Sequence, residues 1–223
     1  LSQFNVQKLK GISEPVLKKL VSQSELQFKK IQDKKLNYKF LPFIKHKGFS
    51  KLPKQNQNDL FFDIEGDPTV DGGHEYLFGI INNNLNNFLS IWSEEYSMEQ
   101  KAFNDVMDYF KKHILKYPES HIYHYNHYEV TQLKRMALKY DDMEVLDFLL
   151  KEKKFIDLYP IVRESLITSE KGLSIKDLEV FYMKKRDTEV ISGADSVDQF
   201  LEWKETKDKD ILKKIEDYNQ DDC

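Results

Sequence analysis

Three short apolar runs in the first half of the chain constrain its fold most. They are LFFDIE at residues 60–65, EYLFGII at 75–81 and FLSIW at 88–92, with the polar stretch NNNLNN at 82–87 before the third run. Aromatic and β-branched runs of this length, bounded by turn residues, are typical of strands. Because short turns join antiparallel neighbours, we expect these three strands to form an antiparallel meander.

A helical pattern and then a further strand follow the predicted meander. Residues 97–114 carry apolar side chains at helical spacing, and Ser97 with Gln100 predicts a capping box at their start. SHIYHY at 120–125 predicts a fourth strand, which leads into a helix at 130–139 and so forms a parallel β-α unit. Further elements are expected as a short strand or loop with a helix at 155–166 and as helices at 174–182, 196–205 and 210–223. This order is that of a ribonuclease-H-like α/β fold, in which a mixed sheet of three antiparallel strands and a parallel extension is flanked by helices.

Residues 1–50 are expected to form a lysine-rich helical appendage to this domain. Apolar spacing in residues 5–32 predicts two helices, the second of which opens at Ser13. The polar, turn-rich stretch at 46–59 is typical of a linker. We therefore place the ribonuclease-H-like domain at residues 55–223.

Charge is distributed unevenly along the chain. Residues 1–54 hold 13 lysines and three acidic residues, a local charge of +10, whereas the remainder carries −14. The basic segment could follow a nucleic-acid backbone or could be a solvated helical face, and both interpretations stay open here. The acidic remainder would repel a polyanion unless metal ions intervened.

Composition is typical of a soluble globular protein. The hydrophobic content is 40%, and the apolar runs fall far short of the roughly 18 to 20 residues of a membrane span. The chain opens with no signal-peptide pattern, and its single cysteine, Cys223, excludes an internal disulfide framework and a cysteine-rich zinc site. We therefore expect a cytoplasmic, reducing environment. Because the chain starts at Leu1 and stops at Cys223 within a predicted helix, we also expect a fragment of a longer protein.

Two carboxylates interrupt the first predicted strand. Asp63 and Glu65 are two residues apart, so on a strand both side chains leave the same face of the sheet. Two like charges in an apolar setting are unfavourable unless a positive charge lies between them. A divalent cation would supply it, and oxygen ligands suit Mg²⁺ or Mn²⁺. The alternative is that the pair ends an edge strand and faces water.

A third acid follows the fourth predicted strand. Glu129 lies at the carboxyl edge of the sheet, where functional residues of open α/β folds gather. His124 and His127 flank it and would offer nitrogen ligands to a softer metal such as zinc, although no further ligand motif supports zinc.

The last predicted helix carries a tyrosine and an acid at helical spacing. Tyr218 and Asp222 are four residues apart and therefore share one helix face. Asp222 could supply a further metal oxygen while the Tyr218 hydroxyl orients a water molecule. The pair could equally belong to an ordinary helix surface.

Taken together, these three elements resemble the exonuclease motifs of the DEDD superfamily, tyrosine (DEDDy) subtype. The motifs are D-x-E on the first strand, an acid preceded by an aromatic residue after the fourth strand, and Y-x-x-x-D on a late helix. The closest similarity is to the YprB-type ribonuclease-H-like domain of predicted exonucleases that accompany RecB-like nucleases. Stretches that carry this resemblance are NDLFFDIEGDP, EYLFGI, HYNHYE, FIDLYPIVR, LSIKDLE and YNQDDC.

The resemblance implies a 3′–5′ exonuclease that hydrolyses phosphodiester bonds of DNA or RNA by a two-metal mechanism. It implies that two Mg²⁺ or Mn²⁺ ions are held by Asp63, Glu65, Glu129 and Asp222, and that Tyr218 orients the attacking water. The implied partners are a single-stranded 3′ end and a RecB-like nuclease or helicase domain in the same or a partner chain, with no membrane involved.

Two positions depart from the family pattern. The third acid is Glu129 rather than aspartate, and Tyr125 stands where the family has asparagine. A catalytically silent module that binds nucleic acid for a neighbouring nuclease or helicase domain is therefore the alternative function. A structural or protein-interaction domain is the third interpretation.

Overall fold

The computed structural model describes residues 11–82, 87–183, 190 and 192–223. The chain forms two compact units: residues 54–158 with 187–223, and residues 1–53 with 159–186. The predicted helix before Ser13 and most of the predicted turn at 82–87 lie outside the described residues. In the described part of the chain, no helix combines the length and the apolar character needed to cross a membrane.

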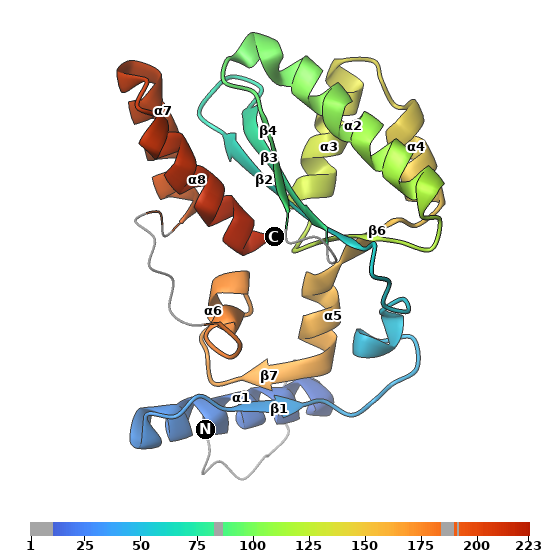
Figure 1. The fold of residues 1–223 in the computed structure, drawn as a ribbon. Coiled ribbons are helices and arrows are strands. Elements are labelled where there is room, and N and C mark those ends of the chain that lie inside the picture. The colour runs from blue at the N-terminus through green and yellow to red at the C-terminus, as the bar shows by residue number, and fades with distance from the viewer. Residues whose placement is uncertain (1–10, 83–86, 184–189, 191) are drawn as a thin grey trace. The chain divides into compact units, whose positions relative to one another are not determined.

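The larger unit is built on a five-stranded mixed sheet with the order β4-β3-β2-β5-β6 (Figure 1). Its strands are β2 (Leu60–Asp67), β3 (His74–Asn82), β4 (Phe88–Trp92), β5 (Ile122–His124) and β6 (Phe155–Asp157). The first three are antiparallel neighbours, and β5 and β6 extend the sheet in parallel with β2. This topology confirms the predicted α/β, ribonuclease-H-like mixed sheet.

Helices cover both faces of this sheet (Figure 1). One face carries α2 (Glu99–Lys116), α3 (Tyr128–Lys139) and α4 (Glu144–Lys151), and the other carries α7 (Gly193–Thr206) and α8 (Lys209–Asp222). On β2, Phe62 and Ile64 point into the core under α2 to α4. There the Phe62 ring packs edge-on against the Phe110 ring, with the ring centroids 5.1 Å apart. The alternation of the strand therefore sends Asp63 and Glu65 to the opposite face, the side of α7 and α8.

The smaller unit joins the N-terminal segment to a stretch from the middle of the chain. Its elements are α1 (Glu14–Asp33), β1 (Tyr38–Phe40), the 3₁₀ turn Gly48–Lys51, α5 (Leu158–Ser165), β7 (Leu166–Thr168) and α6 (Ile175–Glu179). β1 and β7 form an antiparallel ribbon that α1 packs against. The compact units thus divide the chain differently from the boundary placed between residues 50 and 55, and that domain assignment stays a prediction.

Local differences from the predicted helices have local causes. The α2 helix begins at Glu99 with Met98 at its N-cap, because Ser97 lies inside a 3₁₀ turn, Tyr96–Met98, and forms no capping box. By contrast, Ser174 caps α6 as expected, in a capping box with Asp177.

Candidate functional site

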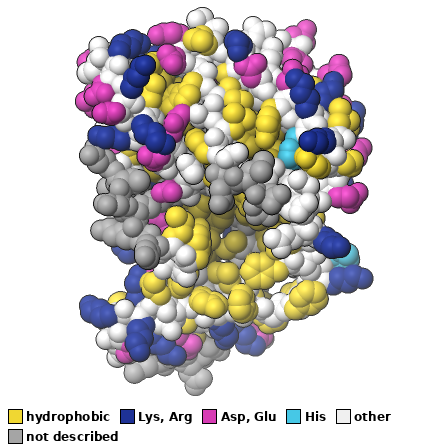
Figure 2. Space-filling view, in the orientation of Figure 1, with side chains coloured by type: hydrophobic (Ala, Val, Ile, Leu, Met, Phe, Trp, Pro, Cys, Tyr) yellow, Lys and Arg dark blue, Asp and Glu magenta, His cyan; other side chains and the backbone are white. Residues whose placement is uncertain are grey.

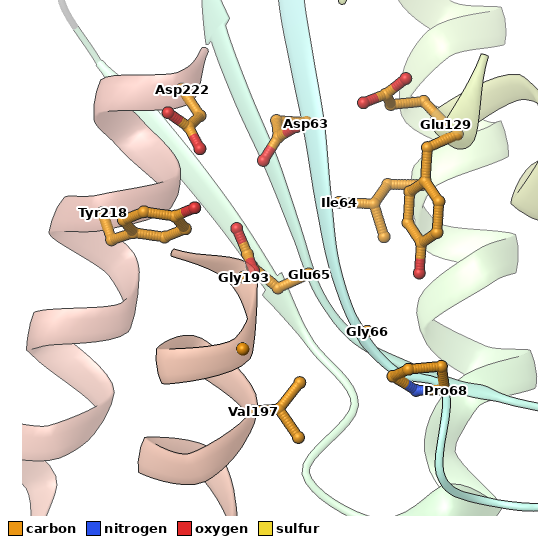
Figure 3. Close-up of a pocket in the computed structure, with 12 residues that line it drawn as sticks. Asp63, Ile64, Glu65, Gly66, Pro68, Glu129, Gly193, Val197, Tyr218 and Asp222 are labelled. Carbon is orange, nitrogen blue, oxygen red and sulfur yellow. The ribbon is translucent and has the colours of Figure 1, made fainter. Parts of the chain in front are cut away.

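A pocket of about 470 Å³ lies in the larger unit and contains all five residues predicted to form the site (Figure 3). The described residues that line it are Asp63, Ile64, Glu65, Gly66, Pro68, Tyr128, Glu129, Gly193, Ala194, Val197, Tyr218 and Asp222. Strand β2 supplies one wall, α8 and the start of α7 a second, and the start of α3 a third.

Three carboxylates form a tight cluster in this pocket. One oxygen from each of Asp63, Glu65 and Asp222 lies within 4.8 Å of the others. Burial raises the pKa of Asp63 well above its ordinary value, and the charges of Glu65, Glu129 and Asp222 raise it further. The cluster is therefore electrostatically unfavourable in the absence of a cation.

Asn219, which the sequence did not single out, holds the cluster together. Its side-chain amide is fully buried and donates to Asp63 Oδ2 at 2.7 Å and to Glu65 Oε1 at 3.4 Å. Its position on α8, four residues after the buried Ile215 and one after Tyr218, gives a spacing that faces inward. A polar residue at an inward-facing helix position is the sequence feature that could have pointed to Asn219.

The position opposite Asn219 on the sheet is Gly79, which pairs with Asp63 in the β2–β3 register. A Cβ at residue 79 would overlap Asn219 Oδ1 and come within 2.8 Å of the Phe88 ring. Glycine here lets α8 approach the sheet closely enough to reach both carboxylates of β2.

We expect Gly79→Ala to lower the free energy of unfolding by about 1–3 kcal/mol, because the new methyl group overpacks this contact. Because Asn219→Ala removes the overlapping atom, the double variant should lose less stability than the sum of the losses in the two single variants. Urea denaturation measures both effects. Gly193→Ala is the matched control, because a Cβ there meets no atom within 4 Å; equal destabilisation by the two glycine variants would contradict the role of Gly79.

The Tyr218 ring extends from α8 toward the carboxylates, and its hydroxyl bonds to Asp222 (Figure 3). Burial raises the pKa of Tyr218, and the charges of Asp222, Glu65 and Asp63 raise it further. The phenol therefore stays protonated at neutral pH. It can donate a hydrogen bond but cannot act as a general base.

Glu129 lines the same pocket but is not part of the three-carboxylate cluster. It lies in the first turn of α3, on the other side of Asp63 from Asp222 (Figure 3). The hydrogen bond between the side chains of Glu129 and Asp63 helps to raise the pKa of Asp63. His124 Nδ1 lies 3.2 Å from Glu129 Oε2 and 2.7 Å from the Asn126 carbonyl. Because both neighbours are acceptors, Nδ1 carries a proton and fixes the orientation of Glu129.

A second contact holds the turn that leads to Glu129. Asn126 has a left-handed backbone conformation with φ of 78°, and its backbone N–H donates to Asp157 Oδ1 at 2.9 Å. Asp157 on β6 thus supports the β5–α3 turn. His127 lies at the surface against Asn126 Oδ1, and among the described residues neither histidine joins the cluster of potential metal ligands.

Two buried carboxylates elsewhere in the larger unit, Glu75 on β3 and Glu99 on α2, lie beside cationic side chains. Arg135 lies 3.0 Å from Glu75 and 3.1 Å from Glu99, and Lys139 lies 2.6 Å from Glu99. Although burial opposes it, the hydrogen bonds of Lys139, Tyr140 and Arg135 lower the pKa of Glu99. No lysine, arginine or histidine is among the described residues that line the carboxylate pocket. An all-oxygen donor set without a cationic side chain fits a hard divalent cation.

The fold and the site together define an RNase-H-like α/β domain with acidic residues on its central strand. Residues 60–223 match the family model RNase_H_2, which is described as RNase_H superfamily. The chain therefore belongs to the RNase H superfamily. No curated protein matches it, and no solved structure does. Membership suggests a nuclease that binds nucleic acid, and nucleases of this fold typically use divalent metals.

Proposed function

We propose that this chain is a metal-dependent 3′–5′ exonuclease that acts on DNA or RNA. One observation carries the proposal: four carboxylates line a pocket in which the described residues offer no cationic side chain. A polyanionic substrate would be repelled there unless bound cations reversed the local charge. The proposal includes a cytoplasmic setting and a neighbouring RecB-like nuclease or helicase domain, as the sequence predicts.

In this proposal Asp63, Glu65 and Asp222 would hold one divalent ion, Mg²⁺ or Mn²⁺, and Asp63 with Glu129 would hold a second. Bound divalent ions would supply a more acidic water and would stabilise the developing negative charge of the phosphodiester. The 3.2 Å contact between His124 Nδ1 and Glu129 Oε2 keeps that carboxylate aimed at the pocket. Because glutamate is longer than aspartate, the Glu129 side chain would reach the second ion from its position on α3.

The other polar groups of the pocket would position reactants rather than exchange protons. Tyr218 keeps its proton and donates a hydrogen bond to Asp222, so its oxygen can accept a hydrogen bond from an attacking water molecule and orient it. Asn219 fixes the Asp63 carboxylate in one rotamer through its 2.7 Å hydrogen bond. Such preorganisation avoids rearranging charged groups during the reaction.

A second candidate function is favoured by the position of Glu129 outside the three-carboxylate cluster. With carboxylate ligands for one metal ion rather than two, the domain would lack the two-metal centre needed for cleavage. It would then bind nucleic acid for a neighbouring domain without cutting it. The two candidates make opposite predictions for cleavage.

The test uses single-stranded DNA and RNA labelled at either end, incubated with the chain and Mn²⁺. We expect a ladder that shortens progressively from the 5′-labelled substrate, immediate release of labelled mononucleotide from the 3′-labelled one, and no reaction in EDTA. Binding without cleavage would favour the silent module. Internal fragments at the earliest time points would contradict exonuclease action.

A further inference from the structure

We infer that the smaller unit carries a binding surface for single-stranded nucleic acid, formed by the exposed rings and lysines of residues 34–53. We call this surface the ring-lysine surface. The inference rests on the proposed action on nucleic acid, but the surface shares no residue with the carboxylate pocket.

Aromatic side chains of this segment lie at the protein surface. The exposed fractions are 56% for Tyr38, 59% for Phe40, 80% for Phe43 and 43% for Phe49. Neighbouring rings meet edge-on, with centroids 5.4 Å apart for Tyr38 and Phe40 and 6.0 Å apart for Phe40 and Phe49. Figure 2 shows apolar side chains gathered over this part of the molecule. Contiguous exposed rings of this kind mark an interaction site.

Lysines flank these rings in the sequence. Residues 34–53 contain six lysines and no acidic residue. Lys39 lies between Tyr38 and Phe40 on β1, but alternation along the strand sends it to the face of the ribbon that carries Ile167, so it lies outside the ring-lysine surface. Lys45 and Lys47 follow Phe43 in an exposed loop. The facing acid is Glu164, which pairs with Lys51 at 2.7 Å.

Exposed rings beside exposed lysines match the chemistry of an unpaired strand. Aromatic rings stack on the faces of unpaired bases, and lysines neutralise the phosphates between them. In a duplex the base faces are occupied by neighbouring bases, so the rings would gain nothing there. A second copy of the chain is a poorer occupant, because a two-fold contact would oppose the same lysines to each other.

The test measures binding without catalysis. A fluorescein-labelled dT₁₂ or U₁₂ oligonucleotide is titrated with the chain in EDTA, and affinity is read by anisotropy at several salt concentrations. We expect Tyr38→Ala/Phe40→Ala to weaken binding about 30-fold or more at every salt concentration, because each of the two lost stacks contributes about 1–3 kcal/mol. Tyr38→Phe/Phe40→Tyr keeps both rings and should bind as the parent does.

The lysines should show a different signature. Lys45→Gln/Lys47→Gln should reduce the slope of log K against log salt by about 1.4, roughly 0.7 for each phosphate contact on a single strand. Lys134→Gln and Leu138→Ala, which remove an exposed lysine and an exposed apolar side chain from α3, are the matched controls.

Two outcomes would overturn the inference. One is unchanged affinity in the folded Tyr38→Ala/Phe40→Ala variant. The other is light scattering that shows a dimer for the parent and a monomer for that variant, because the surface would then join two copies of the chain. Since no cleavage is measured, failure of the proposed exonuclease would leave this binding intact, and loss of this binding would leave metal-dependent cleavage to be scored separately.

Discussion

Asp63→Asn is expected to lower kcat/KM for single-stranded substrate by about 10³-fold or more. Asp63 lies between the other carboxylates and belongs to both proposed ion sites, so the substitution removes a charged oxygen from each. The charge stabilisation that bound ions supply contributes several kcal/mol to lowering the barrier, and about 4 kcal/mol corresponds to a thousandfold change in rate. Single-turnover cleavage of a 5′-labelled oligonucleotide in Mn²⁺ measures the effect.

Asp67→Asn is the matched control for this prediction. Asp67 lies on the same strand and is buried, but its carboxylate accepts from Thr69 and does not line the pocket. We expect that variant to cleave at nearly the parent rate. Activity of the Asp63 variant within a few-fold of the parent, in protein free of contaminating nuclease, would remove the carboxylate site from the reaction.

The same substitution should make the metal-free protein more stable at pH 8. Because the folded protein holds the pKa of Asp63 above its unfolded value, the native state binds more protons than the unfolded state between those two pKa values. The free energy of unfolding therefore falls as the pH rises through that interval. Ionised Asp63 therefore destabilises the metal-free parent, and Asp63→Asn removes this penalty and should raise Tm.

Bound metal should make the parent more stable than the Asp63→Asn variant, the reverse of their order in EDTA. Mn²⁺ binds the native parent and raises its Tm with concentration, whereas the Asp63→Asn variant should respond much less. In EDTA, the advantage of the variant should shrink as the pH is lowered toward 5. Scanning calorimetry at pH 5 and pH 8, with and without Mn²⁺, gives all the required values. A variant less stable than the parent at pH 8 in EDTA would show that the cluster is not under electrostatic strain.

The sequence predicts the sheet well because its strands are local and strongly patterned. LFFDIE, EYLFGII and FLSIW are joined by short connections, and β2, β3 and β4 form at these positions in antiparallel register. The ribbon of β1 and β7 could not be found this way. Each strand has three residues, and the register joins Tyr38 to Thr168, so no local pattern reveals the pairing.

The candidate site shows the same division between local and distant information. Residue spacing places Asp63 with Glu65 on one face of a strand and Tyr218 with Asp222 on one face of a helix. It does not show how far the helix stands from the strand, which depends on the absent side chain of Gly79 and on the amide of Asn219. Nor does it show that Glu129, on a third element, bonds to His124 and lies outside the cluster.

The contact between α8 and β2 also sets an order of events during synthesis. Asn219 reaches Asp63 across 156 residues of sequence, so the acidic pair on β2 is made long before the helix that completes its surroundings. A nascent chain that has released the sheet but not α8 carries two of the three clustered carboxylates and lacks Tyr218. The three-carboxylate cluster is therefore complete only once α8 has left the ribosome.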